Sequence, residues 1–207
     1  MMHSNDRKKH WEEVFLTKDT SKVSWHQPVP ETSLNIIENL KIPKTAKIIE
    51  VGSGDSYLAD YLLKKGYNSI TLLDVSETAI NTIQQRLGKN AANIIFLTED
   101  ILKLTTSEKY DLWHDRAVFH FLTEKSDIEK YVQIVAEKLN PVGFLVIATF
   151  SNNGPDMCSG LKVQQYTEIE IEKTFKKNFK KIECFTQNHT TPSGSIQNFL
   201  FCVFQKN

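Results

Sequence analysis

Short apolar runs alternate with helical segments along most of this chain, and this alternation limits its possible folds more than any other feature. The runs expected to form strands are 47–51, 69–73, 93–97, 110–114 and 144–150. Segments with helical periodicity, at 58–65, 76–87 and 126–139, lie between several of these runs. Strands that are apolar throughout and separated by helices are typical of a parallel sheet covered on both faces. The chain is therefore predicted to be an α/β protein.

Two further apolar runs close the chain, and their short connection predicts a reversed strand. Residues 179–186 and 196–205 are separated by nine residues without a helical pattern. This connection is too short for a parallel crossover, so the two strands are expected to pair antiparallel. The predicted fold is a Rossmann-like, doubly wound sheet of seven mostly parallel strands, with an antiparallel last strand and helices on both faces. A turn at 141–143 is expected to precede the fifth strand.

Local signals mark the ends of several predicted helices. Gly66 and Gly88 stand where a helix C-terminus favours a left-handed residue, and Ser76 is suited to cap the helix that follows it. The sequences at 126–129 and 167–170 both match the capping box, so each predicts the start of a helix.

The chain length of 207 residues suits one domain. Residues 1–207 are expected to form a single domain, with a helical N-terminal segment at 1–42 in front of a core at 43–207. A helix is predicted for 6–16 with Trp11 on its apolar side, and the loop after it contains Trp25.

Charge and cysteine content narrow the classes of partner. Lys and Arg together number 25, as do Asp and Glu, so the formal net charge is zero and the basic excess usual in nucleic-acid-binding proteins is missing. The three cysteines are too far apart for a paired metal or redox motif, so no metal is predicted, and their odd number fits a reducing cytoplasm. No apolar stretch is long enough to span a membrane.

A glycine-rich turn follows the first predicted strand. Its sequence from Glu50 to Gly54 is EVGSG, and a helix is predicted soon after it. Ligands of open α/β sheets bind beyond the carboxyl ends of the strands, where glycines let the backbone approach a ligand closely. Asp74 ends the second strand twenty residues after Gly54, and a carboxylate there is suited to accept the two hydroxyls of a ribose. A nucleoside site is therefore predicted, the alternative for Asp74 being a helix cap or a solvated strand end.

Polar residues also follow the third and fourth strands. Asp100 and Ile101 come just after the third, where a carboxylate could bind an adenine amino group and an isoleucine could cover the ring. The fourth strand is followed by the sequence HDRAVFH at 114–120. Its Asp115 and Arg116 are expected to line a cleft, because charged residues are rarely buried without partners.

These four positions together resemble the class I S-adenosylmethionine (SAM)-dependent methyltransferases. The shared order is an acidic residue and Gly-x-Gly after strand one, an acid after strand two, Glu-Asp after strand three and an Asp after strand four. The resemblance extends from about Trp11 to the end of the chain, and it implies SAM and S-adenosylhomocysteine (SAH) as ligands. Ser56 departs from the family pattern, which often has a third glycine at this position.

The resemblance implies roles around the methionine and ribose parts of SAM. Glu50 and the backbone at Gly52 and Gly54 would hold the methionine part. Asp74 would bind the ribose, with Val75 beside the adenine.

The resemblance also assigns the adenine end and a lid. Asp100 and Ile101 would bind the adenine, and Asp115 would line the methyl-donor and substrate side. The segment 1–42 is similar to the N-terminal lid of small-molecule methyltransferases such as the thiopurine and tellurite-resistance types. Within it Trp25 is expected to cover the cofactor, whose positive sulfur favours an aromatic face. A plain hydrophobic anchor is the alternative for Trp25.

Candidate catalytic residues come from the end of the fourth strand. Methyl transfer needs the nucleophile, methyl group and sulfur in line, and it needs a base only if the attacking atom carries a proton. His120 and Asp115 are the leading candidates, because both flank the cleft end of this strand. His114, His26 and His189 are further candidates, with His189 expected in the loop between the last two strands. A structural role is the alternative for each histidine.

The acceptor stays open at this level. A small molecule is favoured, and a protein lysine is the alternative, since lack of the Asn/Asp-Pro-Pro-Tyr/Phe tetrad argues against many amino-group acceptors without excluding lysine. An NAD(P)-dependent oxidoreductase would share the glycine turn and Asp74, but Tyr57 stands where the dinucleotide pattern needs a third glycine. A non-catalytic binding module would be expected to have lost Asp74 or the glycines.

Overall fold

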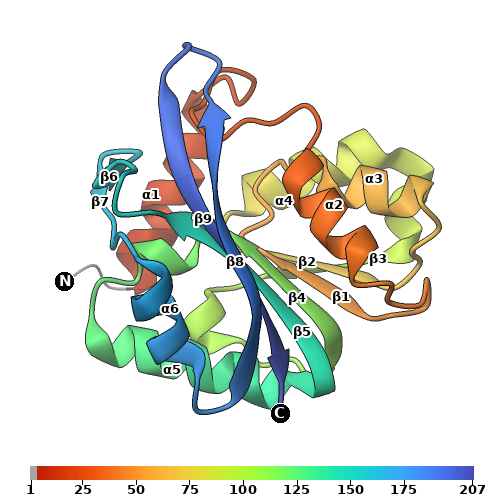
Figure 1. Ribbon diagram of the computed structural model, residues 1–207. Helices are drawn as coiled ribbons and strands as arrows, with labels where there is room; N and C mark the ends of the chain where they lie inside the picture. The colour runs from red at the N-terminus through yellow and green to blue at the C-terminus, as the bar shows by residue number, and fades with distance from the viewer. Residues whose placement is uncertain (1–3) are drawn as a thin grey trace.

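Apolar runs from distant parts of the chain become neighbouring strands in the computed structural model, which describes residues 4–207 (Figure 1). Met1–His3, part of the N-terminal segment analysed above, lie outside the described residues. The strands of the main sheet are β1 (Ile48–Val51), β2 (Ile70–Asp74), β3 (Ile94–Thr98), β4 (Tyr110–Arg116), β5 (Leu139–Phe150), β8 (Phe179–Thr190) and β9 (Ile196–Lys206). Their order is β3-β2-β1-β4-β5-β9-β8. The first five pair in parallel and β9 is antiparallel to both its neighbours, so the predicted fold class is confirmed.

Helices cover the two faces of the sheet in separate groups. The helices are α1 (Ser4–Thr17), α2 (Glu31–Asn39), α3 (Leu58–Lys64), α4 (Glu77–Leu87), α5 (Lys125–Lys138) and α6 (Glu168–Phe175). Helices α2, α3 and α4 contribute to one apolar core, and α5 and α6 to the other; Figure 1 shows the first group at the right and the second at the lower left. Successive strand residues alternate between the cores, as Ile48 and Ile49 do, because side chains of a strand point to opposite faces.

The helix-end signals are correct except at α5. The hydroxyl of Ser76 accepts a hydrogen bond from the Ala79 N–H (3.2 Å), and the capping box at 167–170 is present. The box predicted at 126–129 is wrong, because α5 begins earlier. Glu124 has the extended backbone of an N-cap (φ −91°, ψ 134°), so Ser126 already lies within the first helical turn.

The turn predicted at 141–143 is a bulge inside β5. Tyr110 of β4 pairs with Leu139, whereas Leu112 pairs with Phe144, so a step of two residues on one strand matches a step of five on the other. Val142 has a positive φ of 57° at the centre of the extra residues. The turn-forming residues therefore produce a bulge in β5 and do not end the strand.

The closing hairpin is longer than predicted. Strand β8 continues to Thr190, which shortens the connection to residues 191–195, and Figure 1 shows this hairpin extending beyond the rest of the sheet at the top. His189 therefore lies in a strand, and its predicted loop position is wrong. A small hairpin of β6 (Met157–Cys158) and β7 (Leu161–Lys162), which the sequence patterns did not indicate, follows β5.

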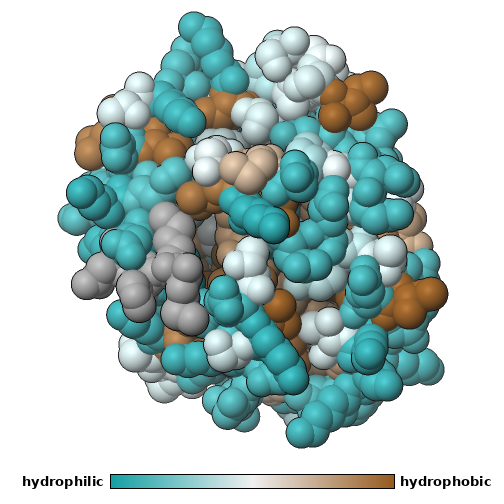
Figure 2. Space-filling view, turned by 90° about the vertical axis from the view of Figure 1, so that its left-hand side faces the viewer, coloured by the Kyte–Doolittle hydropathy of each residue, from teal (hydrophilic) through white to brown (hydrophobic). Residues whose placement is uncertain are grey.

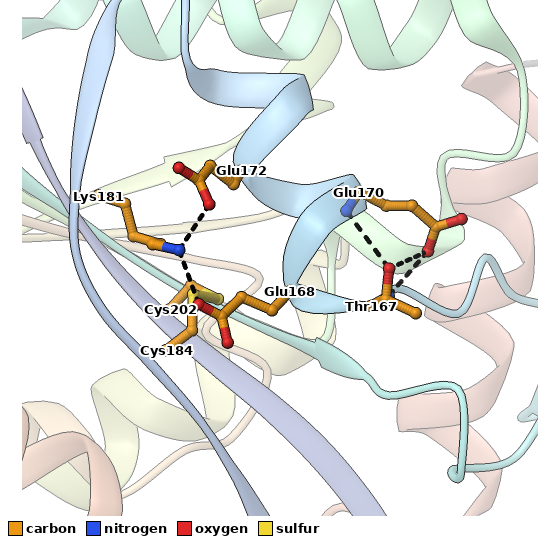
Figure 3. The surroundings of a disulfide bond; sticks show 7 residues. All are labelled: Thr167, Glu168, Glu170, Glu172, Lys181, Cys184 and Cys202. Carbon is orange, nitrogen blue, oxygen red and sulfur yellow. Dashed lines mark hydrogen bonds and ion pairs between the residues drawn. A yellow bond between two sulfur atoms is a disulfide. The ribbon is translucent and has the colours of Figure 1, made fainter.

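The register of the closing hairpin joins two of the three cysteines. Cys184 of β8 lies opposite Cys202 of β9, with Cα atoms 4.2 Å apart, and the two form a disulfide. Figure 3 shows Lys181 beside this pair, reaching across to Glu168 and Glu172 of α6. The cysteines form no closely spaced redox motif, but this disulfide was not predicted from the sequence. Their spacing of 18 residues gave no signal, because strand register alone brings them together.

None of the helices between residues 4 and 207 combines the length and the apolar character that a membrane span requires.

Candidate active site

A cavity of about 160 Å³ lies at the carboxyl ends of β1, β2, β3 and β4, between the sheet and α1. Figure 2, seen from the α1 side of Figure 1, shows apolar side chains in the middle of a mainly hydrophilic face. The predicted cofactor residues in the wall of this cavity are Trp25, Glu50, Gly52, Gly54, Asp74, Val75, Asp100 and Ile101. Residues from four strand ends and the N-terminal segment thus meet in one place.

At the first glycine of the turn there is no space for a side chain. Gly52 has a φ of 63°, and a Cβ added there would lie 1.9 Å from Cγ2 of Val118. Gly54 has a φ of 52°, and its Cβ would lie 3.1 Å from the Phe15 ring of α1. L-residues with side chains rarely adopt this backbone conformation. Both glycines are therefore needed for the turn itself and for the close approach of the lid.

Arg86 of α4 holds the end of the same turn, a role that the sequence analysis missed. Its guanidinium donates to the carbonyl oxygen of Asp55 (2.8 Å) and to that of Ser56, and it pairs with Asp60 (2.9 Å). It also lies over the ring of Tyr57, 4.2 Å from the centroid. Tyr57 and Arg86 thus fill the space beside the turn where the dinucleotide pattern needs a glycine.

Asp74 is buried at the end of β2 and is tied to the turn. Its carboxylate accepts hydrogen bonds from the Gly54 N–H and the Ser76 N–H, both at 2.8 Å. Burial raises the pKa of Asp74 to about 6, although these two hydrogen bonds lower it. The carboxylate therefore orients the turn as well as facing the cavity.

Glu50 brings a buried and incompletely bonded carboxyl group to the cavity wall. Only 5% of the residue is exposed, and its Oε2 has no hydrogen-bond partner among residues 4–207. Burial raises the pKa of Glu50 to about 8, despite the opposing effects of Ser56 and Arg86. A buried acceptor without a donor is unfavourable, so the site favours a ligand that supplies a positive donor.

The opposite end of the cavity is closed by an ion pair from α1. The Arg7 guanidinium donates through Nε and Nη2 to one oxygen of Asp100 (3.3 and 3.1 Å), and through Nη1 to Asp127 (3.0 Å). The other oxygen of Asp100 accepts from the Leu102 N–H (2.9 Å). Asp100 therefore positions both α1 and the backbone at Ile101.

A second tie joins α1 to the start of α4. The Glu12 carboxylate accepts hydrogen bonds from the Ser76 hydroxyl (2.8 Å), the Glu77 N–H (2.9 Å) and the Thr78 N–H (3.2 Å). Burial by itself raises the pKa of Glu12. The hydrogen bonds from Thr78 and Ser76 lower it further than burial raises it, so the pKa lies below its ordinary value. A carboxylate at a helix N-terminus is favourable. No residue pattern predicts this contact, because it depends on where α1 lies.

Aromatic rings form the roof of the cavity. Trp11 lies 5.9 Å from Trp25 and 5.1 Å from Phe121 between ring centroids, and Phe15 lies 6.5 Å from Trp25. All four rings line the cavity. They offer apolar and aromatic faces to a ligand.

Comparison with protein families matches residues 48–143 to a model described as "Methyltransferase domain". These residues contain the glycine turn, Asp74, Asp100 and the end of β4. The chain thus carries a methyltransferase domain, and its fold is that of class I SAM-dependent methyltransferases. The fold expected of this family, the sheet order and the reversed β9 agree with that assignment.

Known relatives of this methyltransferase domain differ in what their names say they methylate. Malonyl-[acyl-carrier protein] O-methyltransferase 2 of Ilyobacter polytropus is 28% identical over 137 residues, which are 66% of this chain and 50% of that protein. The chain thus spans half the length of that relative. Human EEF1A lysine methyltransferase 2 is 24% identical over 96% of this chain and 85% of its own.

Solved structures show the same fold. N-methyltransferase NodS from Bradyrhizobium japonicum, solved with SAH, superimposes with a TM-score of 0.71 at 18% identity and covers 97% of this chain and 99% of its own.

Asp115 does not line the cavity of the methyltransferase domain, contrary to expectation. The side chain is fully buried, and its carboxylate accepts from the Val118 N–H (2.9 Å), the Phe119 N–H (3.3 Å) and the Tyr131 hydroxyl (2.5 Å). Burial raises its pKa to about 6 against these three hydrogen bonds. Asp115 lies within β4, because this strand continues two residues beyond its predicted end. Its side chain faces α5, as the bond to Tyr131 shows. The carboxylate therefore stabilises the turn that follows β4. It does not reach the cavity, where a catalytic or cofactor contact was expected.

His120 also lies behind the cavity wall. It is fully buried, its Nδ1 accepts from the Phe150 N–H (3.3 Å), and its Nε2 has no partner among the described residues. Burial and then Arg116 lower its pKa to about 3. A weakly basic imidazole outside the cavity is not placed to remove a proton from a bound acceptor. The catalytic role expected of His120 does not fit this position.

The other candidate histidines are divided between the cavity and its surroundings. His114 and His26 line the cavity, and the Nε2 of His114 is 2.8 Å from the Ser33 hydroxyl. Burial lowers the pKa of His114 to about 3.

His189 lies outside the wall, with its Nε2 2.7 Å from the carbonyl oxygen of Ser24. It therefore supports the loop that carries Trp25.

Proposed function

We propose that this chain binds SAM in the cavity and transfers its methyl group to a small acceptor. The observation that carries the proposal is the buried, unpartnered Oε2 of Glu50 beside a turn in which Gly52 leaves no space for a side chain. An α-ammonium group is the donor that would satisfy this oxygen. The residues present therefore fit the methionine part of SAM.

The remaining parts of SAM fit the other strand ends. Glu50 and the backbone at Gly52 and Gly54 would hold the methionine part, and Asp74 the ribose hydroxyls, with Val75 beside the adenine. These residues share one cavity wall, which supports the assignment.

The adenine end and the roof follow the same logic. Asp100 and Ile101 would receive the adenine, with the Asp100 carboxylate already oriented by Arg7. When bound, SAM supplies an electrophilic methyl group on a positively charged sulfur. Trp25 and the neighbouring rings would exclude water and face that charge.

The protein's contribution to the reaction is then mainly positioning. Holding two reactants in line supplies up to about 7–11 kcal/mol of a barrier. Asp115 and His120 support this geometry from behind, through the turn after β4 and the backbone of β5. An acceptor that needs a base would find His26 in the wall of the cavity.

A small acceptor is favoured because α1 covers the cavity. Arg7 and Glu12 hold this helix at two points, and the cavity volume is about 160 Å³. A protein lysine is the second candidate, supported by the human EEF1A lysine methyltransferase 2, which matches this chain over 96% of its length. The likeness of segment 1–42 to thiopurine and tellurite-resistance lids stays a prediction, as does a cytoplasmic location.

Calorimetry with SAM, SAH and NADH tests the proposal. Wild-type protein should bind SAM and SAH but not NADH, and Asp74→Ala should weaken SAM binding by at least about tenfold, because a charged group loses its hydrogen bonds to the ribose. Asp156→Ala, which removes an exposed carboxylate that is not part of the cavity wall, is the matched control. Binding of NADH alone, or equal SAM affinity in wild type and Asp74→Ala with both folded, would contradict the proposal.

A further inference from the structure

A second charged group in the cavity wall lacks a partner. Arg116, the last residue of β4, donates through Nη1 to the carbonyl oxygen of Trp25 (3.1 Å) and lies over the Phe199 ring, 4.7 Å from its centroid. Its Nε and Nη2 are shielded from solvent and make no hydrogen bond to any of the described residues. Buried donors without an acceptor are costly, so these two N–H groups indicate a missing partner.

The other arginines show what this partner should be. The chain has three arginines, and Arg7 and Arg86 each use the edge formed by Nε and Nη2 to bind a carboxylate. Arg7 binds Asp100 at 3.3 and 3.1 Å, and Arg86 binds Asp60 at 3.3 and 2.9 Å. In Arg116 the same edge is the unpartnered one. This edge presents two parallel donors that match two carboxylate oxygens.

No salt bridge offsets the charge of Arg116 within the described part of the chain. Arg116 contributes, after burial, to the lowered pKa of three nearby histidines, His114, His120 and His189. Glu50 acts on Arg116 electrostatically but forms no ion pair with it within the described part of the chain. An anion placed at Arg116 would offset the burial of the guanidinium.

We propose that the Nε–Nη2 edge of Arg116 binds a carboxylate of a ligand in the cavity. This inference rests on the proposed function, because the reaction offers two sources of such a group. One is the methionine carboxylate of SAM, and the other is an acidic acceptor held beside the aromatic roof. In both cases Arg116 orients one end of a reactant while Trp25, whose carbonyl it also binds, covers the site.

Calorimetry on the full chain with three probes separates the two sources. SAM and decarboxylated SAM are titrated into the wild type and into Arg116→Gln and Arg116→Lys. Benzoate, with benzamide as its neutral counterpart, is titrated into the same proteins saturated with SAH. Lys180→Gln removes one exposed positive charge elsewhere and is the matched control. Thermal unfolding of each variant shows whether it is folded, and Arg116→Lys retains the charge if the glutamine variant unfolds.

A donor-side role is expected to lower the SAM affinity of Arg116→Gln by at least about tenfold, with no change for decarboxylated SAM. An acceptor-side role is expected to leave SAM affinity unchanged but to abolish benzoate binding, while benzamide binding is equal in all variants. Equal affinities of the wild type and both Arg116 variants for every probe would overturn the inference. Failure of wild-type protein to bind SAM would instead contradict the proposed function.

Discussion

The two ends of the cavity are built in different ways. At the donor end, from Glu50 to Asp74, the residues lie within one strand-turn-helix-strand unit and contact one another through the backbone. At the other end, Trp11 and Trp25 of the N-terminal segment meet Phe121 and Arg116 only because α1 and the loop after it lie over the sheet. A local motif therefore encodes the first end, whereas the second depends on packing.

This difference explains which predicted site residues lie in the cavity wall and which do not. Every cofactor residue predicted at the donor end lies in the cavity wall. Asp115 and His120, predicted for the methyl-donor and acceptor side, lie behind it. Substitutions between Glu50 and Asp74 should accordingly change ligand binding directly, and those of Asp115 and His120 should change stability.

The largest effect is expected from Gly52→Ala. The added Cβ would overlap with Val118 at 1.9 Å, and the positive φ adds backbone strain, so SAM binding should be lost. Calorimetry gives the affinity, and Gly160→Ala, also at positive φ but with open space around it, isolates the backbone contribution. Partial recovery in a Gly52→Ala/Val118→Ala double variant would identify the overlap as the cause. Normal SAM binding by Gly52→Ala would show that the donor end is less rigid than described.

Glu50→Gln should separate binding from stability. SAM affinity should fall by about 10- to 100-fold, because a charged hydrogen bond to the ammonium is lost. The pKa of about 8 in the folded state lies above the ordinary value, so the wild type loses stability as the pH rises from 4.5 to about 8. The glutamine variant has no such loss and should melt at a higher temperature than the wild type at pH 8, with the difference vanishing near pH 4.

The pH dependence of SAM binding tests the same group. Wild-type affinity should increase between pH 6 and 8, by up to about tenfold per unit, because Glu50 must lose its proton to bind an ammonium. Glu50→Gln should lack this part of the slope. Identical pH profiles for the two proteins would exclude Glu50 as the ammonium site.

His120→Ala should have a small effect on turnover. The imidazole is buried and has a pKa of about 3, so it does not titrate between pH 5 and 8. Loss of its hydrogen bond to the Phe150 N–H should lower the free energy of unfolding by about 1–3 kcal/mol. The pH–rate profile with a methyl acceptor should keep its shape. A profile that loses a step near neutral pH in the variant would restore His120 as a base.

The smallest effect on binding is expected from Cys184→Ser. The disulfide joins β8 and β9 away from the cavity, so SAM affinity should be unchanged. Its loss should lower the free energy of unfolding by up to about 3 kcal/mol, the amount expected for a loop of this length. Thermal unfolding with and without a reductant measures the difference, and a change in SAM affinity would show that the hairpin influences the cavity.

The errors in the sequence predictions share a physical cause. The helix start at 126–129, the turn at 141–143 and the position of His189 were judged from local residue preferences. Strand pairing overrides these preferences, since β5 tolerates a bulge at Val142 and the β8–β9 pairing continues through His189. The alternation of apolar runs was a safer guide, because it reflects burial on both faces of a sheet.

The sequence by itself determined the α/β class, the reversed strand and the donor end of the cavity. Those features follow from strand periodicity and from a backbone turn whose glycines and acidic residue lie within 25 residues of Glu50. Only the tertiary structure decided the rest. It placed Arg7 on Asp100, buried Asp115 and His120, paired Cys184 with Cys202 and left one edge of Arg116 unpartnered. Burial and pairing between distant segments depend on how helices pack and strands register, and no local pattern of residues records either.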